Sequence, residues 1–178
     1  MKPECGSCQN CAEPMERVEF TREMKKDYTI LIPSMLEIQF TLLRNVFRSY
    51  GYKMELLDND SRAVVETGLK YVHNDTCYPA LLVIGQMINA LDSGKYDLHK
   101  TALMITQTGG GCRASNYIHL LRKALKKAGY GYIPVISLNL SGLEKHSGFH
   151  WTLGLIRKLV AAMAYGDLMM LLANQVRP

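Results

Sequence analysis

The chain alternates short apolar runs with longer stretches in which apolar positions recur every three or four residues. The short runs are typical of buried parallel strands, and the longer stretches are typical of helices that pack one face on a sheet. This pattern predicts strands at residues 28–32, 52–57, 101–106 and 133–138, and helices at residues 35–50, 62–72, 79–91, 114–127 and 152–173.

This element order predicts an α/β fold, namely a three-layer, flavodoxin- or Rossmann-like domain with a parallel sheet of about four strands. Pro134 falls in the fourth predicted strand and has no N–H to donate, so this strand is expected at an edge of the sheet. The strand order 2-1-3-4 meets that condition and places the topological switch between the first and third strands. Ligands of open α/β sheets bind at the carboxyl ends of the strands beside the switch, so the loops there form the candidate site.

Local signals predict where helices start and which residues they bury. Ser34 followed by Glu37 has the sequence of a capping box and predicts the start of the first helix. Ser34 would also face the crevice beside the switch. In the last helix, Met163, Met169 and Met170 are interpreted as core-filling residues, because methionine adapts to irregular gaps between packed elements.

The first 27 residues differ from the rest, and we assign residues 1–27 to a cysteine-containing N-terminal segment and residues 28–178 to the domain. Cys5, Cys8 and Cys11 have the spacing C-x2-C-x2-C, which brings three sulfurs onto one tight loop and suits a cluster iron or zinc. The bacterial ferredoxin run continues with a fourth cysteine and a proline, and this chain has no such cysteine there. The alternative is a flexible leader whose cysteines act only in a larger assembly.

Two isolated cysteines give the most specific chemical signal. Cys77 and Cys112 each follow a predicted loop and open a predicted helix, where outward-pointing N–H groups and the helix dipole favour a thiolate. Gly109, Gly110 and Gly111 precede the second cysteine and let the backbone approach a bulky anion. The two motifs predict the mouth of an iron–sulfur site. The alternative is a pair of buried structural thiols.

Basic residues in two places could contact an anion. Arg113 directly follows Cys112 and could balance the charge of a cluster or bind a thioester or phosphate, or it could simply be solvated at the start of a helix. A second group is either the solvated face of an amphipathic helix or a contact for a phosphate-bearing ligand. Its members are Arg122, Lys123, Lys126 and Lys127.

Composition limits the class of protein. With 178 residues, 48% of them apolar, the chain is long enough for one globular domain with a core. The net charge of +5 is too small to predict a nucleic-acid partner without aromatic residues among the basic ones. We expect no membrane span, because the apolar stretch at residues 155–173 contains Arg157, Lys158 and Asp167. Five cysteines without a visible signal peptide favour metal or redox chemistry in the cytoplasm.

Four segments of the chain resemble a known family. Their positions are residues 74–86 (NDTCYPALLVIGQ), 93–97 (SGKYD), 107–117 (QTGGGCRASNY) and 135–144 (VISLNLSGLE). They resemble the 2-hydroxyacyl-CoA dehydratase superfamily, most closely the C-terminal dehydratase-like part of the large activator-type proteins, the acyl-CoA dehydratase activases. The resemblance runs from about residue 28 to residue 167.

This resemblance implies a cofactor and partners. Family members are cytoplasmic enzymes of anaerobes, either lyases or low-potential reductases, and their flavodoxin-like domains hold a [4Fe–4S] or double-cubane cluster through cysteine thiolates. A partner ATPase supplies one electron, and the dehydratases then remove water from a 2-hydroxyacyl-CoA. By resemblance, Cys77 and Cys112 would be cluster ligands in this chain. The implied partners are further dehydratase-like domains or subunits, an ATPase activator and an acyl-CoA.

The chain departs from the family in its ligand supply. Family clusters take a further cysteine from another domain, and no cysteine follows Cys112 here. The glycines at 109–111 are also not followed by the Gly-Lys-Ser/Thr of a P-loop. We therefore expect an iron–sulfur domain that transfers low-potential electrons within a larger lyase or reductase. Its role would extend from electron transfer to activation of the substrate. The domain is expected to be inactive alone, and its catalytic residues are unknown. The alternative is a metal-free flavodoxin-like module that binds CoA or a nucleotide phosphate through the glycines, or docks a partner subunit.

Overall fold

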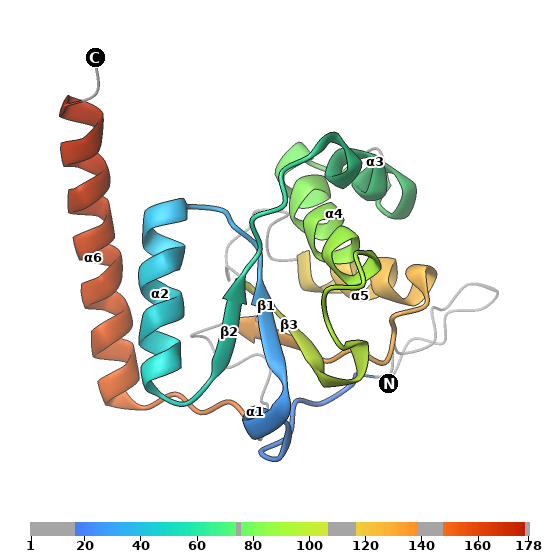
Figure 1. The fold of residues 1–178 in the computed structure, drawn as a ribbon, viewed down its shortest axis with the longest axis horizontal. Coiled ribbons are helices and arrows are strands. Elements are labelled where there is room, and N and C mark those ends of the chain that lie inside the picture. Colours follow the sequence, from blue (N-terminus) through green and yellow to red (C-terminus); the bar gives the residue numbers. More distant parts are fainter. Residues whose placement is uncertain (1–16, 74–75, 107–116, 139–147, 177–178) are drawn as a thin grey trace, which may run out of the picture.

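The computed structural model describes residues 17–73, 76–106, 117–138 and 148–176 (Figure 1). Its strands form a parallel sheet in the order β2-β1-β3-β4, with Thr29 level with Lys53 on one side and with Thr101 on the other. The α/β class and the strand order 2-1-3-4 are therefore confirmed. The strands are β1 (Thr29–Ile32), β2 (Lys53–Leu56), β3 (Thr101–Thr106) and β4 (Val135–Leu138).

Helices flank the sheet on both faces, as Figure 1 shows. One face is covered by α4 and α5, with α3 packed on α4, and the other face is covered by α2, with α6 packed along α2. The helices are α1 (Met24–Asp27), α2 (Glu37–Ser49), α3 (Arg62–Tyr71), α4 (Tyr78–Asp92), the short 3-10 helix η1 (Leu98–Lys100), α5 (Tyr117–Ala128) and α6 (Leu153–Val176).

The strands divide their side chains between two cores because successive residues of a strand point to opposite faces. Leu31 and Leu103 join the core under α4 and α5. Ile30 and Met104 join the core under α2. These side chains are at most 1% exposed, and burying each one stabilises the fold by about 1.5–3 kcal/mol. The apolar runs are therefore buried on both sides, as expected for a parallel sheet with helices on both faces.

Pro134 lies one residue before β4 and not within it. The strand is nevertheless at the edge of the sheet, as predicted. The Pro134 carbonyl accepts a hydrogen bond from the Leu103 N–H at 2.9 Å, so the proline still takes part in pairing with β3 through its acceptor. A residue without an N–H can hold this position because only its carbonyl is used.

The capping box predicted at Ser34 is not formed. The residue before α2 is Leu36. Its backbone is extended (φ −141°) and its side chain makes no capping hydrogen bond, so the helix begins at Glu37. Ser34 instead donates its backbone N–H to Oε1 of Gln86 in α4, at 3.0 Å. This contact holds the chain extended beyond β1, so the helix starts later than the local sequence predicts.

The interpretation of the methionines of α6 as core residues is wrong. Met169 and Met170 are 39% and 38% exposed, and Met163 is only partly buried. The reason is that α6 packs on α2 and not on the sheet, so only one side of the helix is covered. The two helices approach closely at Gly166, where a Cβ would lie 2.8 Å from Cγ of Gln39. No helix in the described ranges has the length and apolarity needed to cross a membrane.

The described part of the N-terminal segment lies against the sheet domain. Phe20 is fully buried in the core under α2. Its carbonyl accepts a hydrogen bond from the Gly148 N–H at 2.8 Å. The domain boundary assigned at residue 28 stays a prediction, and residues 17–27 contribute to the packing of the domain.

Candidate functional site

The carboxyl ends of the strands define the candidate site, and α4 presents Cys77 there. Because α4 leads into β3, it runs opposite to the strand, and its first residues lie at the edge where the parallel strands end. Cys77 immediately precedes α4, and its carbonyl accepts from the N–H groups of Ala80 and Leu81 at 3.0 and 3.2 Å. The residue is exposed. Its backbone therefore starts the helix, while its side chain is accessible at this edge.

Cys77 contacts the beginning of the helix that follows β3. Its Sγ lies 3.0 Å from the phenol oxygen of Tyr117, and either group can donate the hydrogen bond. Tyr117 is the first residue of α5 and is buried in the core that α4 and α5 share. The starts of α4 and α5 are therefore neighbours, and a thiol and a phenol meet between them.

The other residues predicted for the site lie outside the described residues. They are Cys5, Cys8, Cys11, Gly109, Gly110, Gly111, Cys112 and Arg113. Their roles stay predictions. Within the described ranges, no three His, Cys, Asp or Glu residues are grouped so that they could hold a metal ion. Any metal held by Cys77 therefore needs ligands from elsewhere in the chain or from a partner.

Gln86 connects three segments at the same edge, and sequence reasoning missed it. Its side chain is buried, accepts from the Ser34 N–H beyond β1, and donates to the Asn59 carbonyl beyond β2 at 2.9 Å. Nδ2 of Asn59 in turn donates to the Gln86 carbonyl at 3.0 Å. The ends of β1 and β2 are thereby fixed to the middle of α4. The sequence feature that could have identified Gln86 is a single glutamine within the mainly apolar sequence of that helix, because a buried polar side chain needs hydrogen-bond partners.

Replacing Gln86 by leucine is expected to lower the free energy of unfolding by about 3 kcal/mol. The leucine fills a similar volume but leaves the Ser34 N–H and the Asn59 carbonyl without their partner, at a cost of about 1–3 kcal/mol each. Urea unfolding followed by circular dichroism measures the loss. The same substitution at the exposed Gln175 is the control and should change stability by less than about 0.5 kcal/mol. Equal stability of both variants would contradict this role for Gln86.

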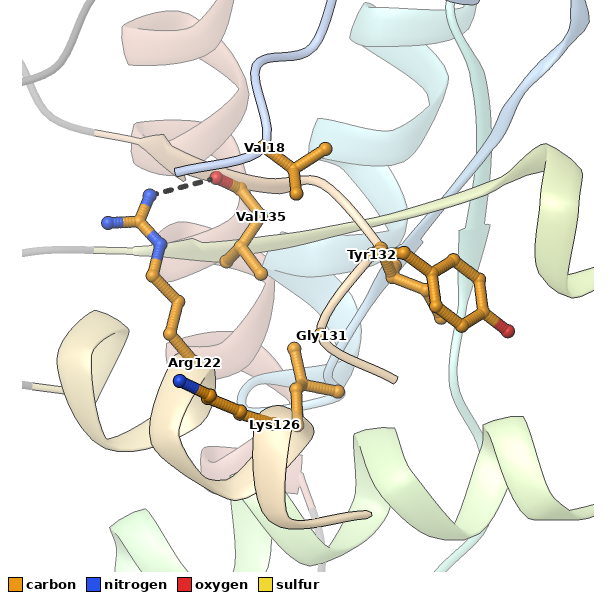
Figure 2. Close-up of a pocket in the computed structure, with 8 residues that line it drawn as sticks. Val18, Arg122, Lys126, Gly131, Tyr132 and Val135 are labelled. Carbon is orange, nitrogen blue, oxygen red and sulfur yellow. Dashed lines mark hydrogen bonds between the residues drawn. The ribbon is translucent and has the colours of Figure 1, made fainter. Parts of the chain in front are cut away.

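A hollow of about 440 Å³ lies between α5 and the segment that enters β4 (Figure 2). Figure 2 shows Arg122 and Lys126 projecting beside it from α5, with Val18 and Tyr132 on other sides. Nη2 of Arg122 donates to the Val135 carbonyl at 3.4 Å. The hollow therefore combines a basic side with an apolar floor.

A second hollow, of about 610 Å³, lies on another side of α5, against the end of α3. Among the described residues, its lining includes four lysines and one histidine and no acidic residue: Lys70, His73, Lys123, Lys126 and Lys127. Nζ of Lys70 lies 5.0 Å from the ring centre of Tyr71, and Nζ of Lys127 donates to the Lys70 carbonyl at 2.7 Å. The basic residues predicted on α5 thus line two hollows that share Lys126.

Two of the resolved pKa shifts belong to residues that follow the ends of helices on the far side from Cys77. The Tyr130 phenol donates to Oδ1 of Asp92 at 2.6 Å, and this hydrogen bond to a carboxylate raises the pKa of Tyr130 to about 12. A hydrogen bond from Lys95 to the Glu55 carboxylate, at 2.9 Å, raises the lysine pKa well above its usual range. Tyr130 and Lys95 follow the C-terminal ends of α5 and α4, whereas Cys77 lies at the N-terminal end of α4. These contacts join elements at the opposite edge of the sheet.

The fold is a flavodoxin-like parallel α/β domain with an exposed cysteine at its carboxyl edge. Residues 29–98 match the family model DUF2229, described as the CoA enzyme activase uncharacterised domain. The match runs from β1 through α4 and includes Cys77, but it covers less than half of the chain. It links this part of the chain to a domain associated with CoA enzyme activases. Neither the search of curated proteins nor the search of solved structures finds a match.

Proposed function

We propose that this chain is an iron–sulfur cluster-binding domain of a CoA enzyme activase-like system and acts in low-potential electron transfer. One observation supports this most directly: the exposed Cys77 lies at the carboxyl edge, 3.0 Å from the first residue of α5. Cys112 precedes that residue, Tyr117, by five positions in the sequence. Its Cα is therefore within about 18 Å of the Cα of Tyr117, whatever the course of the chain between them.

The surroundings of Cys77 suit one ligand of an anionic cluster. The first turn of α4 has no acidic residue, and its outward N–H groups and dipole favour negative charge at this position. The described residues supply this one thiolate, so the proposal takes Cys112 as the second ligand. Cys5, Cys8 and Cys11 are the candidates within the chain for the remaining positions.

Cys77, Tyr117 and Gln86 each have a defined role in this proposal. A bound [4Fe–4S] or double-cubane cluster supplies one-electron transfer at low potential. Cys77 holds the cluster, and the Tyr117 hydroxyl donates a hydrogen bond to Sγ, which shifts the reduction potential. Gln86 holds α4, and hence Cys77, against the ends of β1 and β2. The family description supports association with CoA-dependent enzymes, and the proposal extends the partners to an ATPase activator and an acyl-CoA enzyme of the dehydratase type.

Anaerobic reconstitution with iron and sulfide tests the proposal. We expect the desalted full-length chain to retain iron and acid-labile sulfide in equal amounts and to give an electron paramagnetic resonance signal after reduction. The same treatment in the presence of a chelator is the control. A chain that retains neither element, with its circular dichroism spectrum unchanged, would contradict cluster binding by this chain.

A second candidate function is binding of a phosphate-bearing ligand such as CoA. The basic hollows on α5 favour it, because Lys123, Lys126 and Lys127 line one hollow to which the described part of the chain contributes no acidic residue. Ionised donors of this kind bind phosphate oxygens through strong, charge-assisted hydrogen bonds. The glycines at 109–111 would supply further N–H groups in this alternative.

Substituting Lys126→Glu is expected to weaken CoA binding at least about tenfold, because one charge-assisted hydrogen bond contributes about 1.5–3 kcal/mol. Lys126 is the basic residue common to both hollows. Isothermal titration calorimetry at low and moderate salt measures the change. Lys100→Glu makes the same change of charge at an exposed position of η1 and should bind CoA with nearly the wild-type affinity. Equal weakening in both variants would indicate a general effect of charge and no ligand site at the hollows.

A further inference from the structure

The side of α6 that faces away from α2 carries a continuous stripe of apolar residues. The spacing of three and four residues keeps its members on one side of the helix for more than three turns. All of them are exposed, with exposed fractions of 64% for Val160, 57% for Tyr165 and 55% for Leu171. The apolar stripe consists of Val160, Ala161, Ala164, Tyr165, Leu168, Leu171 and Leu172.

This exposure is unusual for a monomer. Together with Leu153 and Val176, the stripe presents on the order of 800 Å² of apolar side-chain surface, which is the area that one partner contributes to a standard protein interface. Contiguous apolar patches on monomers rarely exceed a few hundred Å². In the part of the chain that the structure describes, α6 packs against α2, on the opposite side from the stripe. Figure 1 shows α6 as the outermost helix on that side of the sheet, beyond α2.

We propose that the apolar stripe binds the same stripe of a second copy of this chain, in an antiparallel, twofold-symmetric dimer. Size complementarity supports this arrangement. With the twofold axis near residues 164 and 165, Leu168 of one copy lies opposite Ala161 of the other, because both positions are equally far from the axis along α6. The small Ala161 and Ala164 let the two helices approach, and the larger leucines fill the space beside them.

Charge also favours pairing of identical stripes. The stripe itself contains no charged residue. In this arrangement Arg157 lies opposite Leu172 of the other copy, and its long side chain can keep the charged group in solvent at the rim of the interface. Asp167, the nearest acidic residue on the helix, accepts a hydrogen bond from Nε2 of Gln39 in α2 at 2.9 Å. Arg157 and Lys158 precede the stripe. An uncharged, self-complementary face suits a second copy better than it suits a strongly charged partner.

Sedimentation equilibrium of the full chain tests the dimer. We expect a dimer at micromolar concentration, and Leu168→Glu should raise its dissociation constant at least a hundredfold by placing a charge opposite Ala161. Leu69→Glu, at a similarly exposed leucine of α3, is the matched control and should leave the dissociation constant unchanged. A wild-type chain that is monomeric throughout this range would overturn the proposal. A dimer that persists in Leu168→Glu with unchanged circular dichroism would overturn it as well.

Hydrogen exchange distinguishes this dimer from coverage by the chain's own residues. In the dimer, amide exchange in α6 slows as the concentration is raised through the dissociation constant, while exchange in β1 and β3 does not change. Protection of α6 that is independent of concentration, in a monomer, would mean that another segment of the same chain covers the stripe, and the proposal would be wrong. This readout does not depend on how well the glutamate variant folds.

Discussion

Cys77→Ala and Cys112→Ala are each expected to reduce the iron and sulfide retained after anaerobic reconstitution at least tenfold. Thiolates are the protein ligands of iron–sulfur clusters, and loss of a ligand weakens binding more than loss of an outer hydrogen bond, which alone costs about 10–100-fold in metal affinity. The Cys77 side chain is exposed and hydrogen-bonds to the Tyr117 hydroxyl, so its removal should lower the free energy of unfolding by only about 1 kcal/mol. Iron and sulfide analysis with circular dichroism measures both quantities.

Tyr117→Phe is the matched control for the loss of Cys77. It keeps the thiol and removes only the hydroxyl that lies 3.0 Å from it. We expect this variant to retain its cluster with a changed reduction potential. If both cysteine variants keep their iron and sulfide, the cluster is held by Cys5, Cys8 and Cys11, and replacing those three by serine should then remove it.

Gly85→Ala is expected to lower the free energy of unfolding by about 3 kcal/mol or more. α3 and α4 cross at Gly68 and Gly85, and a Cβ on Gly85 would overlap the Val64 carbonyl and lie 2.9 Å from the Gly68 nitrogen. These are backbone atoms that cannot move aside without separating the helices, and overpacking of this kind costs about 1–3 kcal/mol and sometimes more. Alanine would otherwise stabilise a helix by about 1 kcal/mol over glycine, so a net loss identifies the close crossing.

Urea unfolding of Gly85→Ala against Gly131→Ala measures this effect. At Gly131 the nearest atom to an added Cβ is 3.6 Å away, an ordinary contact, so that variant should stay within about 0.5 kcal/mol of the wild type. If the two variants are equally stable, α3 can shift relative to α4 at little cost. In that case the crossing at Gly68 and Gly85 is looser than the structure indicates.

The sheet could be predicted from the sequence because its signals are local. The apolar run at residues 29–32 is buried on both faces, so its composition alone indicates a central strand. Gly94 follows the end of α4 with a positive φ of 71°, a conformation that glycine adopts without strain. The start of α2 could not be predicted in this way. Ser34 is held by Gln86, which is 52 positions away, and no local pattern contains that contact.

The exposed α6 was misjudged for a related reason. A run rich in methionine and leucine indicates burial, but it does not indicate which surface buries it. The helix packs on α2 along one side, so Met169 and Met170 remain partly exposed. For the candidate site, the topology predicted ligand binding at the carboxyl ends of the strands, and the structure places Cys77 at that edge, before the first residue of α4. The partner of its thiol, Tyr117, has no distinguishing sequence pattern and was found only from the structure.

The hydrogen bonds of Gln86 affect how tightly the carboxyl edge of the sheet can bind a ligand. Because α4 is fixed at its middle to the ends of β1 and β2, the position of Cys77 is set when the chain folds and does not wait for a ligand. The entropy lost in ordering this side of the site therefore belongs to folding and is not subtracted from the affinity of binding. A chain lacking these bonds would have to order α4 and its thiol during each encounter, and would bind the same ligand more weakly with the same contacts.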